Sequence, residues 1–224
     1  MELKQSGVRP RLPKAIIFDW DNTLVDSWPV IHDALNTTLT AFGHPPWTLA
    51  ETQRRVRKSM RDSFPGLFGE QWQQAAGVFY ERYEDIHANT IRPLEGAEDM
   101  LQSISALDVY LGVVSNKRGD FLRLEADQLG WSGYFGRLVG ANDAEHDKPA
   151  AEPVEMALNG SGEGPGERVW LIGDADIDME CAHNAGCTPV LLRQEKPAPD
   201  EFLTFPPKWQ FGTCDALCKW LRNL

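Results

Sequence analysis

A short apolar segment that ends in two carboxylates constrains the fold of this chain more than any other feature. Residues 15–18 read Ala-Ile-Ile-Phe, and Asp19 and Asp21 follow, separated by one tryptophan. An apolar run of about four residues bounded by polar turn formers is typical of a buried parallel strand. The aspartates would then lie at the carboxyl end of that strand, where open α/β sheets hold their ligands.

Two neighbouring carboxylates repel each other and lose hydration where they meet a folded core. A chain that keeps such a pair therefore uses it to bind a cation or to exchange protons, so Asp19 and Asp21 indicate a reactive site. The alternative that these two residues alone leave open is an acidic surface loop after a core strand.

The rest of the chain alternates between strand-like apolar runs and segments of helical periodicity. Besides residues 15–18, strands are predicted at 110–114, 137–139, 169–172 and 189–192. Helices are predicted at 96–107, 119–129, 152–158, 178–185 and 215–222. This alternation implies right-handed βαβ units, so the predicted fold class is α/β, a doubly wound, Rossmann-like parallel sheet covered on both faces.

The long interval between the first and second strands is helical throughout. Helices are predicted there at residues 30–42, 48–60 and 70–89, separated by Pro45-Pro46 and Pro65-Gly66. Thr48 and Glu51 form the pattern of a capping box at the start of the second of these helices. We therefore predict a helical cap domain over residues 26–92, inserted into a core domain made of residues 1–25 and 93–224.

The composition excludes several classes of partner. Hydrophobic residues make up 42% of the chain and charged residues 25%, values typical of a soluble globular protein. The formal net charge of −11 argues against nucleic acid or an anionic membrane as a partner, because both bind proteins through phosphate neutralisation. No apolar run approaches the roughly 20 residues that span a bilayer, and residues 1–14 lack the apolar centre of a signal peptide. We predict a cytoplasmic protein, a monomer or homodimer, that acts on a small molecule.

Polar residues follow the other predicted strands at the point where each strand ends. Ser115-Asn116 ends the second strand, Lys148 follows the third, and Asp174 and Asp178 follow the fourth. Because parallel strands present their carboxyl ends at one edge of the sheet, these groups should meet the first two aspartates there. Carboxylate oxygens suit a hard cation such as Mg²⁺, and hydroxyl and ammonium donors suit a phosphoryl group. The sequence therefore predicts a site that holds both.

In order and spacing, these motifs resemble those of the haloacid dehalogenase-like (HAD) hydrolases, in the phosphoglycolate phosphatase-like branch with a helical cap. The first family motif, Asp-x-Asp-x-Thr, matches residues 19–23, and the second, a strand ending in Ser or Thr, matches Ser115. The third is similar to Lys148-Pro149, and the fourth, Gly-Asp-x-x-x-Asp, is similar to residues 173–178. Asn22 departs from the pattern, since many members have glycine there, but asparagine also accepts turn conformations.

The resemblance implies an aspartyl-phosphate mechanism with Mg²⁺ as cofactor. Asp19 would be the nucleophile, and Asp21 would protonate the leaving oxygen and later activate water. Ser115 and Lys148 would bind the phosphoryl oxygens. The metal would be held by the Asp19 carboxylate, the Asp21 backbone carbonyl and the Asp174 carboxylate. Thr23, Asn116 and Asp178 would support these residues without binding the phosphoryl group, with Thr23 fixing the loop and Asp178 bracing Lys148 or a metal-bound water.

The same resemblance implies a small phosphorylated substrate, such as phosphoglycolate or a sugar phosphate, and leaves other reactions open. Phosphosugar mutases share the cap, and phosphonate hydrolases need a cap lysine, for which Lys58 is the one candidate. Two alternatives from other classes are a receiver-like phospho-accepting module and a catalytically silent binding protein. The Asp-x-Asp unit on the first strand, followed by a helical insertion, favours the hydrolase over the receiver. The four intact motifs argue against the silent protein.

A basic cluster interrupts this acidic chain within the predicted cap. Between Glu51 and Asp62 it comprises Arg54, Arg55, Arg57, Lys58 and Arg61. On a single helix beginning near Thr48, Arg54, Lys58 and Arg61 would share one face. We expect that face to look down on the first aspartate and to grip a carboxylate or second phosphate of the substrate, with Lys58 and Arg61 as substrate-binding residues. A solvated, charged helix face is the alternative.

Overall fold

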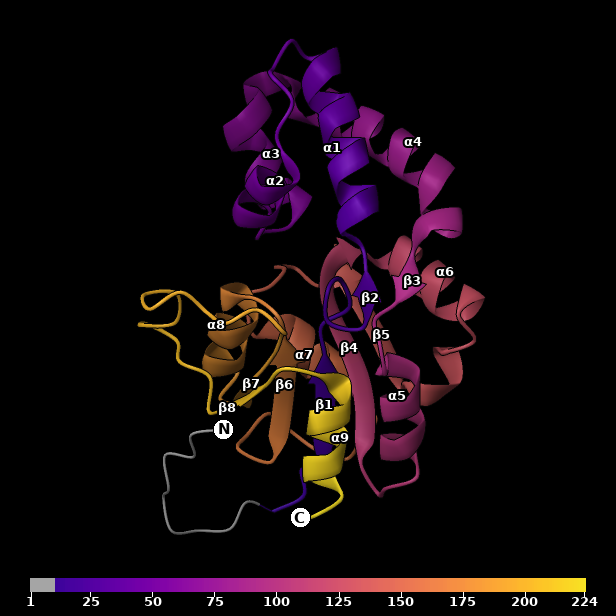
Figure 1. The fold of residues 1–224 in the computed structure, drawn as a ribbon, viewed down its shortest axis with the longest axis vertical. Helices are drawn as coiled ribbons and strands as arrows, with labels where there is room; N and C mark the ends of the chain where they lie inside the picture. Colours follow the sequence, from indigo (N-terminus) through magenta and orange to yellow (C-terminus); the bar gives the residue numbers. More distant parts are fainter. Residues whose placement is uncertain (1–10) are drawn as a thin grey trace.

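The centre of the protein is a six-stranded parallel sheet (Figure 1). A computed structural model describes residues 11–224. The strand order is β5 (Arg137–Ala141), β4 (Tyr110–Arg118), β1 (Ala15–Phe18), β6 (Val169–Gly173), β7 (Thr188–Leu192) and β8 (Trp209–Phe211). Every neighbouring pair in this order is parallel, which confirms the predicted α/β class.

The central strand β1 is apolar because helices cover both of its faces. All four of its residues are fully buried. Ile16 and Phe18 pack in the cluster that includes α5 (Ala97–Ser105), α6 (Gly119–Gln128) and α9 (Cys214–Leu221). Ala15 and Ile17 point to the opposite face, against α7 (Glu152–Leu158) and α8 (Asp176–Asn184). The alternation of side chains along one short strand thus supplies both layers of the core.

The helical insertion stands over the carboxyl-end edge of the sheet, at the top of Figure 1. It contains α1 (Trp28–Ala41), α2 (Leu49–Arg55), α3 (Met60–Phe68), the short 3₁₀ helix at Gly69–Gln71, and α4 (Trp72–Thr90). Two short antiparallel strands, β2 (Val25–Asp26) and β3 (Arg92–Pro93), pair where the chain leaves and re-enters the core. We call these helices the cap. It has an apolar cluster of its own, formed by Leu35, Leu39, Phe64, Phe68 and Ala75.

The single helix predicted over residues 48–60 is wrong, because the structure divides that segment into α2 and α3. The capping box is confirmed: the Thr48 hydroxyl accepts a hydrogen bond from the Glu51 N–H at 3.2 Å, and the Glu51 carboxylate accepts from the Thr48 N–H at 2.8 Å. The helix then ends at the β-branched Val56, whose backbone is extended. Ser59 precedes α3, and its hydroxyl donates to the Asp62 carboxylate at 3.0 Å. The predicted shared face of Arg54, Lys58 and Arg61 therefore does not exist.

The proline at position 65 does not separate two helices as predicted. It lies inside α3, which continues to Phe68. The break comes at Gly69, whose φ of 56° is a left-handed conformation that glycine adopts without steric cost. The strands β2, β3 and β8 were not predicted, because runs of two or three residues carry no readable periodicity. Within residues 11–224, no helix has the length and apolar character needed to cross a membrane.

Close packing of α6 on β5 gives a testable constraint on the fold. A Cβ atom on Gly140 would lie 2.4 Å from the Gly119 Cα, a backbone contact that no side-chain rotation relieves. We expect Gly140→Ala to lower the free energy of unfolding by about 1–3 kcal/mol, as overpacking commonly does. Urea denaturation of the variant and of the wild type measures this difference in the free energy of unfolding. Gly133→Ala is the matched control, since nothing lies within 4 Å of its added Cβ. Equal stability of the two variants would contradict the packing argument.

Candidate active site

The loop after β1 holds the first two aspartates at the edge of the sheet. The Asp19 N–H still donates to the carbonyl of Ile172 on β6, at 2.8 Å, so the backbone of Asp19 is fixed by the sheet. The chain then turns back on itself, and the Asn22 N–H donates to the Val25 carbonyl at 2.7 Å. Asn22 has a φ of 65°, in the left-handed region that asparagine tolerates better than most residues. Asparagine therefore suits the conformation that this turn requires at position 22.

Lys148 connects two carboxylates that come from different segments of the chain. Its ammonium group donates to Asp19 Oδ1 at 2.6 Å and to Asp178 Oδ1 at 2.7 Å, and all three side chains are buried. Burial lowers the pKa of Lys148, but Asp178 and Asp19 together raise it above its ordinary value. The ammonium therefore stays charged. Thr23 lies on the other side of Asp19 and donates to Asp19 Oδ2 at 3.1 Å.

Burial dominates the ionisation of the predicted nucleophile. It raises the pKa of Asp19 from 3.8 to about 7, against the lowering effect of Lys148 and with the further raising effect of Asp178 and Asp21. The pKa of Asp174 is also raised well above its ordinary value, by burial first and then by Asp178 and Asp19. Several carboxylates crowded into a desolvated space call for added positive charge.

The acidic cluster fits a divalent metal ion. One carboxylate oxygen each from Asp19, Asp174 and Asp178 lie within 4.8 Å of one another. Asp178 already accepts from Lys148 with one oxygen and from the Ala175 N–H, at 3.1 Å, with the other. Asp174 has no ion-pair partner among residues 11–224. Asp174 is thus the carboxylate of the cluster with the most capacity for a hard cation, and Mg²⁺ prefers such oxygen ligands. Asp19 and Asp178 each already accept one hydrogen bond on each carboxylate oxygen, and they surround the same space.

Glycine at position 173 permits this crowding. A Cβ atom there would lie 2.2 Å from the Asp178 Cγ. The fourth motif therefore needs glycine for a spatial reason, because any side chain would push Asp178 away from Lys148.

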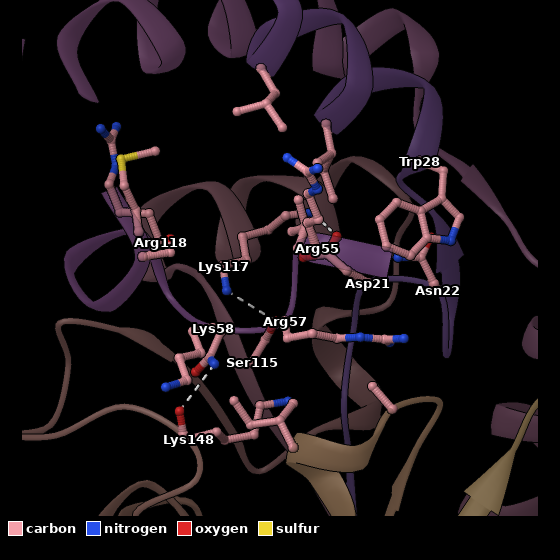
Figure 2. Close-up of a pocket in the computed structure, with 18 of the residues that line it drawn as sticks. Asp21, Asn22, Trp28, Arg55, Arg57, Lys58, Ser115, Lys117, Arg118 and Lys148 are labelled. Atoms are coloured by element: carbon pink, nitrogen blue, oxygen red, sulfur yellow. Dashed lines mark hydrogen bonds and ion pairs between the residues drawn. The ribbon is translucent and has the colours of Figure 1, made fainter. Parts of the chain in front are cut away.

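The ends of β4 and β1 open onto the same pocket (Figure 2). Its floor is formed by predicted site residues, namely Asp19, Asp21, Ser115, Asn116, Lys148, Asp174 and Asp178. Asn116 donates to the Lys148 carbonyl at 3.1 Å, and its Oδ1 is buried with no partner among the described residues. The cavity measures about 190 Å³ and extends from this floor up into the cap. Thr23 does not line this pocket, and it contacts the site only through its hydrogen bond to Asp19 Oδ2.

Sequence reasoning missed a second buried ionic network, centred on Glu125 of α6. Lys117 lies 2.5 Å both from Asp21 Oδ1 and from Glu125 Oε2. Glu125 also accepts from Trp20 Nε1 at 2.8 Å and from the Tyr83 hydroxyl at 2.9 Å. A further bond at 3.1 Å joins Glu125 to His87 Nδ1. Because Tyr83 and His87 belong to cap helix α4, the network ties the cap to the loop that carries Asp21.

A signal for this network was present in the sequence. Glu125 lies among Phe121, Leu122 and Ala126 on the buried face of α6. A charged residue at an apolar position of an amphipathic helix indicates either a paired buried charge or a misplaced helix. Lys117 directly follows the Ser115-Asn116 motif and was within reach of the same reasoning.

Lys58 and Arg61, the two cap residues predicted to bind substrate, lie in different places in the structure. Lys58 lies on the pocket wall, in the segment between α2 and α3. Arg61 lies outside that wall and forms a bidentate pair with Asp147, with its Nε and Nη2 each 2.6 Å from a carboxylate oxygen. Asp147 is buried next to Lys148 in the core, so the Arg61 pair joins α3 of the cap to the core.

The ionisation of Glu125 gives a pH-dependent stability prediction. Burial raises the pKa of Glu125, but the charge of Lys117 and hydrogen bonds from His87, Lys117 and Trp20 outweigh burial. Together they lower the pKa from 4.5 to about 2. A depressed carboxyl pKa stabilises the folded state above pH 4.5, and the stabilisation is lost as pH falls towards 2. We expect Glu125→Gln to lower the free energy of unfolding at pH 7 by about 3 kcal/mol, the energy equivalent of this shift.

The measurement is chemical denaturation of Glu125→Gln and wild type at several pH values. The stability difference should shrink between pH 4.5 and pH 2, where wild-type Glu125 takes up its proton. Glu163→Gln, at an exposed loop position, is the control and should follow wild type throughout. A stability difference that is independent of pH would refute the assigned charge state of Glu125.

Comparison with known proteins identifies the family. The model of the haloacid dehalogenase-like hydrolases matches residues 16–192. A phosphoglycolate phosphatase from Xylella fastidiosa is 30% identical over 178 residues, which cover 78% of this chain and 77% of that protein. The pyrophosphatase PpaX of Bacillus velezensis is 25% identical over 172 residues, which cover 77% and 79% of the two chains. A haloacid dehalogenase-like family hydrolase of known structure from Streptococcus pneumoniae has the same fold, with a TM-score of 0.81, 22% identity, and coverage of 93% of this chain and 98% of that one. Since the family model spans most of the sequence and its motifs meet in one pocket, this chain belongs to the haloacid dehalogenase-like hydrolases.

Proposed function

We propose that this protein is a Mg²⁺-dependent phosphomonoester hydrolase that acts on a small phosphorylated metabolite through an aspartyl-phosphate on Asp19. One observation carries the proposal: Asp19 is buried on the floor of a pocket, fixed by Lys148 and Thr23, beside an acidic cluster that fits a divalent cation. The relatives named phosphoglycolate phosphatase support a phosphatase within the family. Phosphoglycolate itself, or a sugar phosphate, is a substrate of the proposed class.

In the first half-reaction, a carboxylate oxygen of Asp19 attacks phosphorus. The bond between phosphorus and the ester oxygen breaks, and the leaving alcohol takes a proton from Asp21. Lys148 and Ser115 hold the phosphoryl oxygens, since a buried ammonium and a hydroxyl both stabilise charge that develops there. The products of this step are the alcohol and an acyl-phosphate on Asp19.

In the second half-reaction, water attacks the phosphorus of the acyl-phosphate. Asp21 takes the proton of that water, the bond between phosphorus and the Asp19 oxygen breaks, and inorganic phosphate leaves. Both aspartates return to their starting states. Asp19, Asp174 and the Asp21 backbone carbonyl would hold Mg²⁺, which when bound neutralises the charge of the phosphoryl oxygens and of the carboxylates around them.

Lys117 and Ser27 hold the Asp21 carboxylate in this structure. Lys117 approaches Asp21 Oδ1 to 2.5 Å, and the Ser27 hydroxyl donates to the same oxygen. Asp21 is thus oriented at the wall of the pocket from two sides, which restricts its side chain before substrate binds. Such restriction is what a general acid needs in order to meet a leaving oxygen in a defined position.

One further reaction is favoured by a specific observation. Lys58 lies on the pocket wall and has no ion-pair partner among residues 11–224, as a Schiff-base lysine of a phosphonate hydrolase would require. Borohydride trapping with an aldehyde-bearing phosphonate would label Lys58 if that reaction occurred. Release of phosphate from phosphate monoesters, with no labelling of Lys58 by the phosphonate, would support the phosphomonoesterase instead.

The roles of the two aspartates can be tested by conservative replacement. Asp19→Asn should abolish both turnover and phosphoenzyme formation, because an amide does not act as the nucleophile. Asp21→Asn should lose most activity on alkyl phosphates and less on nitrophenyl phosphate, whose leaving oxygen needs little protonation. Phosphate release and phosphoenzyme trapping measure the two effects, and circular dichroism checks the fold. Turnover by Asp19→Asn would overturn the mechanism.

The metal assignment can be tested first by a binding measurement and then by activity. Mg²⁺ should raise the melting temperature of the wild type, since a ligand at a hundredfold excess over its Kd adds about 2.7 kcal/mol to stability. Asp174→Ala should lose this response. Asp176→Ala is the matched control, because Asp176 is exposed and lies outside the acidic cluster. Activity should also disappear in excess chelator, and full activity there would argue against a metal-dependent reaction.

A further inference from the structure

The pocket above the proposed reaction site has an apolar roof. From the floor at Asp19 and Ser115, the cavity continues between the cap helices. Its cap side is lined by large apolar and aromatic side chains that remain only partly buried, chiefly Trp28, Trp47, Met60, Leu67, Phe79 and Tyr80. They come from α1, from the segment before α2, from α3 and from α4, so four separate parts of the cap contribute to one surface. Figure 2 shows Trp28 near Asp21 and Asn22 on this wall.

The cations of the cap are mostly engaged by the protein itself. Arg61 pairs with Asp147, and Arg57 lies 3.8 Å from Asp176. The Arg55 guanidinium lies 4.6 Å above the Trp47 ring. Within residues 11–224, Lys58 is the lysine or arginine of the pocket wall that has neither an ion pair nor an aromatic ring as a partner. The cap therefore offers little unpaired charge to the part of the substrate beyond the phosphate.

A two-carbon phospho-acid would leave most of this wall uncovered. Its carbons would lie near the floor, and among the described residues of the wall its carboxylate would find Lys58 as the one unpaired cation amid aromatic and aliphatic groups. A ring, by contrast, would bury its own apolar surface together with that of the wall, and aromatic neighbours add favourable edge and offset contacts. The wall is thus complementary to an aromatic group rather than to a short anion.

We propose that the substrate is a phosphate monoester whose leaving alcohol carries an aromatic ring, seated against Trp28, Trp47, Phe79 and Tyr80. This proposal rests on the phosphomonoesterase function above and names its substrate class. The phosphate occupies the floor beside Lys148 and Ser115, and the ring projects into the cap. Hydrolysis then yields the aromatic alcohol and inorganic phosphate, with the proton balance given for the two half-reactions.

A series of alkyl phosphates of similar leaving-group basicity separates binding from chemistry. The series is ethyl phosphate, octyl phosphate, 2-phenylethyl phosphate and 2-(naphthyl)ethyl phosphate, with phosphoglycolate as the small anionic comparison. We expect kcat/KM to rise at least tenfold from ethyl to 2-(naphthyl)ethyl phosphate, a difference of about 1.4 kcal/mol. Equal values, or a preference for phosphoglycolate, would overturn the proposal. A preference for octyl over 2-(naphthyl)ethyl phosphate would overturn the aromatic assignment.

Paired tryptophan variants locate the effect in the pocket. Trp47→Ala should reduce the ratio of kcat/KM for 2-(naphthyl)ethyl over ethyl phosphate at least fivefold. Trp72→Ala is the matched control, since Trp72 packs against the same apolar cluster of the cap but does not line the pocket. Its ratio should match the wild-type value. Equal losses in both variants, or none in Trp47→Ala, would contradict the assigned position of the ring.

A binding measurement keeps this inference separate from the proposed reaction. The non-hydrolysable phosphonates that correspond to the ethyl and naphthylethyl esters are titrated into Asp19→Asn and into wild type by calorimetry. At least tenfold tighter binding of the naphthylethyl phosphonate supports the aromatic site, even if no ester of the series is hydrolysed. Equal or weaker binding overturns it, whatever the outcome for turnover.

Discussion

A buried ammonium group between two carboxylates is the interaction on which the site depends. Lys148, Asp19 and Asp178 are all removed from water, so each charge would be strongly destabilising without the other two. Lys148 and Asp19 lie 129 positions apart in the sequence, and they meet only when β1 and the segment after β5 are both in place. The catalytic geometry is therefore a product of the whole core, and it cannot form before the parallel sheet does.

The Glu125 network extends the same logic from the core to the cap. One carboxylate holds Trp20 of the first motif loop, Lys117 after the second motif, and Tyr83 and His87 of α4. With four partners, Glu125 is compensated well enough to remain ionised in the interior, as its lowered pKa indicates. A change in the position of α4 must disturb these bonds, and through Lys117 it must also disturb the Asp21 carboxylate. Cap position and the orientation of Asp21 are thus physically linked.

The sequence predicted the core and its rim better than it predicted the cap. The β1 run and the polar residues at the strand ends were readable because a buried parallel strand and its carboxyl end have fixed positions in an α/β sheet. The break at Val56 was not predicted, because one helical pattern was extended across the β-branched Val56 and the Ser59–Asp62 pair, which mark the boundary locally. Arg61 was assigned to substrate by its charge and by the helix face that it was predicted to share with Lys58, yet the structure pairs it with Asp147, a partner that no local pattern identifies. Contacts between charged residues far apart in the chain were therefore the features that the sequence predicted least well.

The floor and the roof of the pocket are under different physical constraints. The floor is built from the ends of several strands and from α8, so a change in one residue there disturbs the buried charges of the others. The roof comes from one continuous stretch between β2 and β3 that has its own apolar cluster, and ion pairs and hydrogen bonds of Arg61, Tyr83 and His87 also join it to the core. Trp28, Trp47 and Leu67 of this roof carry none of the buried charges of the floor, so they can differ without disturbing those ion pairs. Relatives of this chain bear names such as phosphoglycolate phosphatase and pyrophosphatase, which differ in the group attached to the phosphoryl group. In the function proposed above, the floor would set the phosphoryl chemistry and the roof would select the group that leaves.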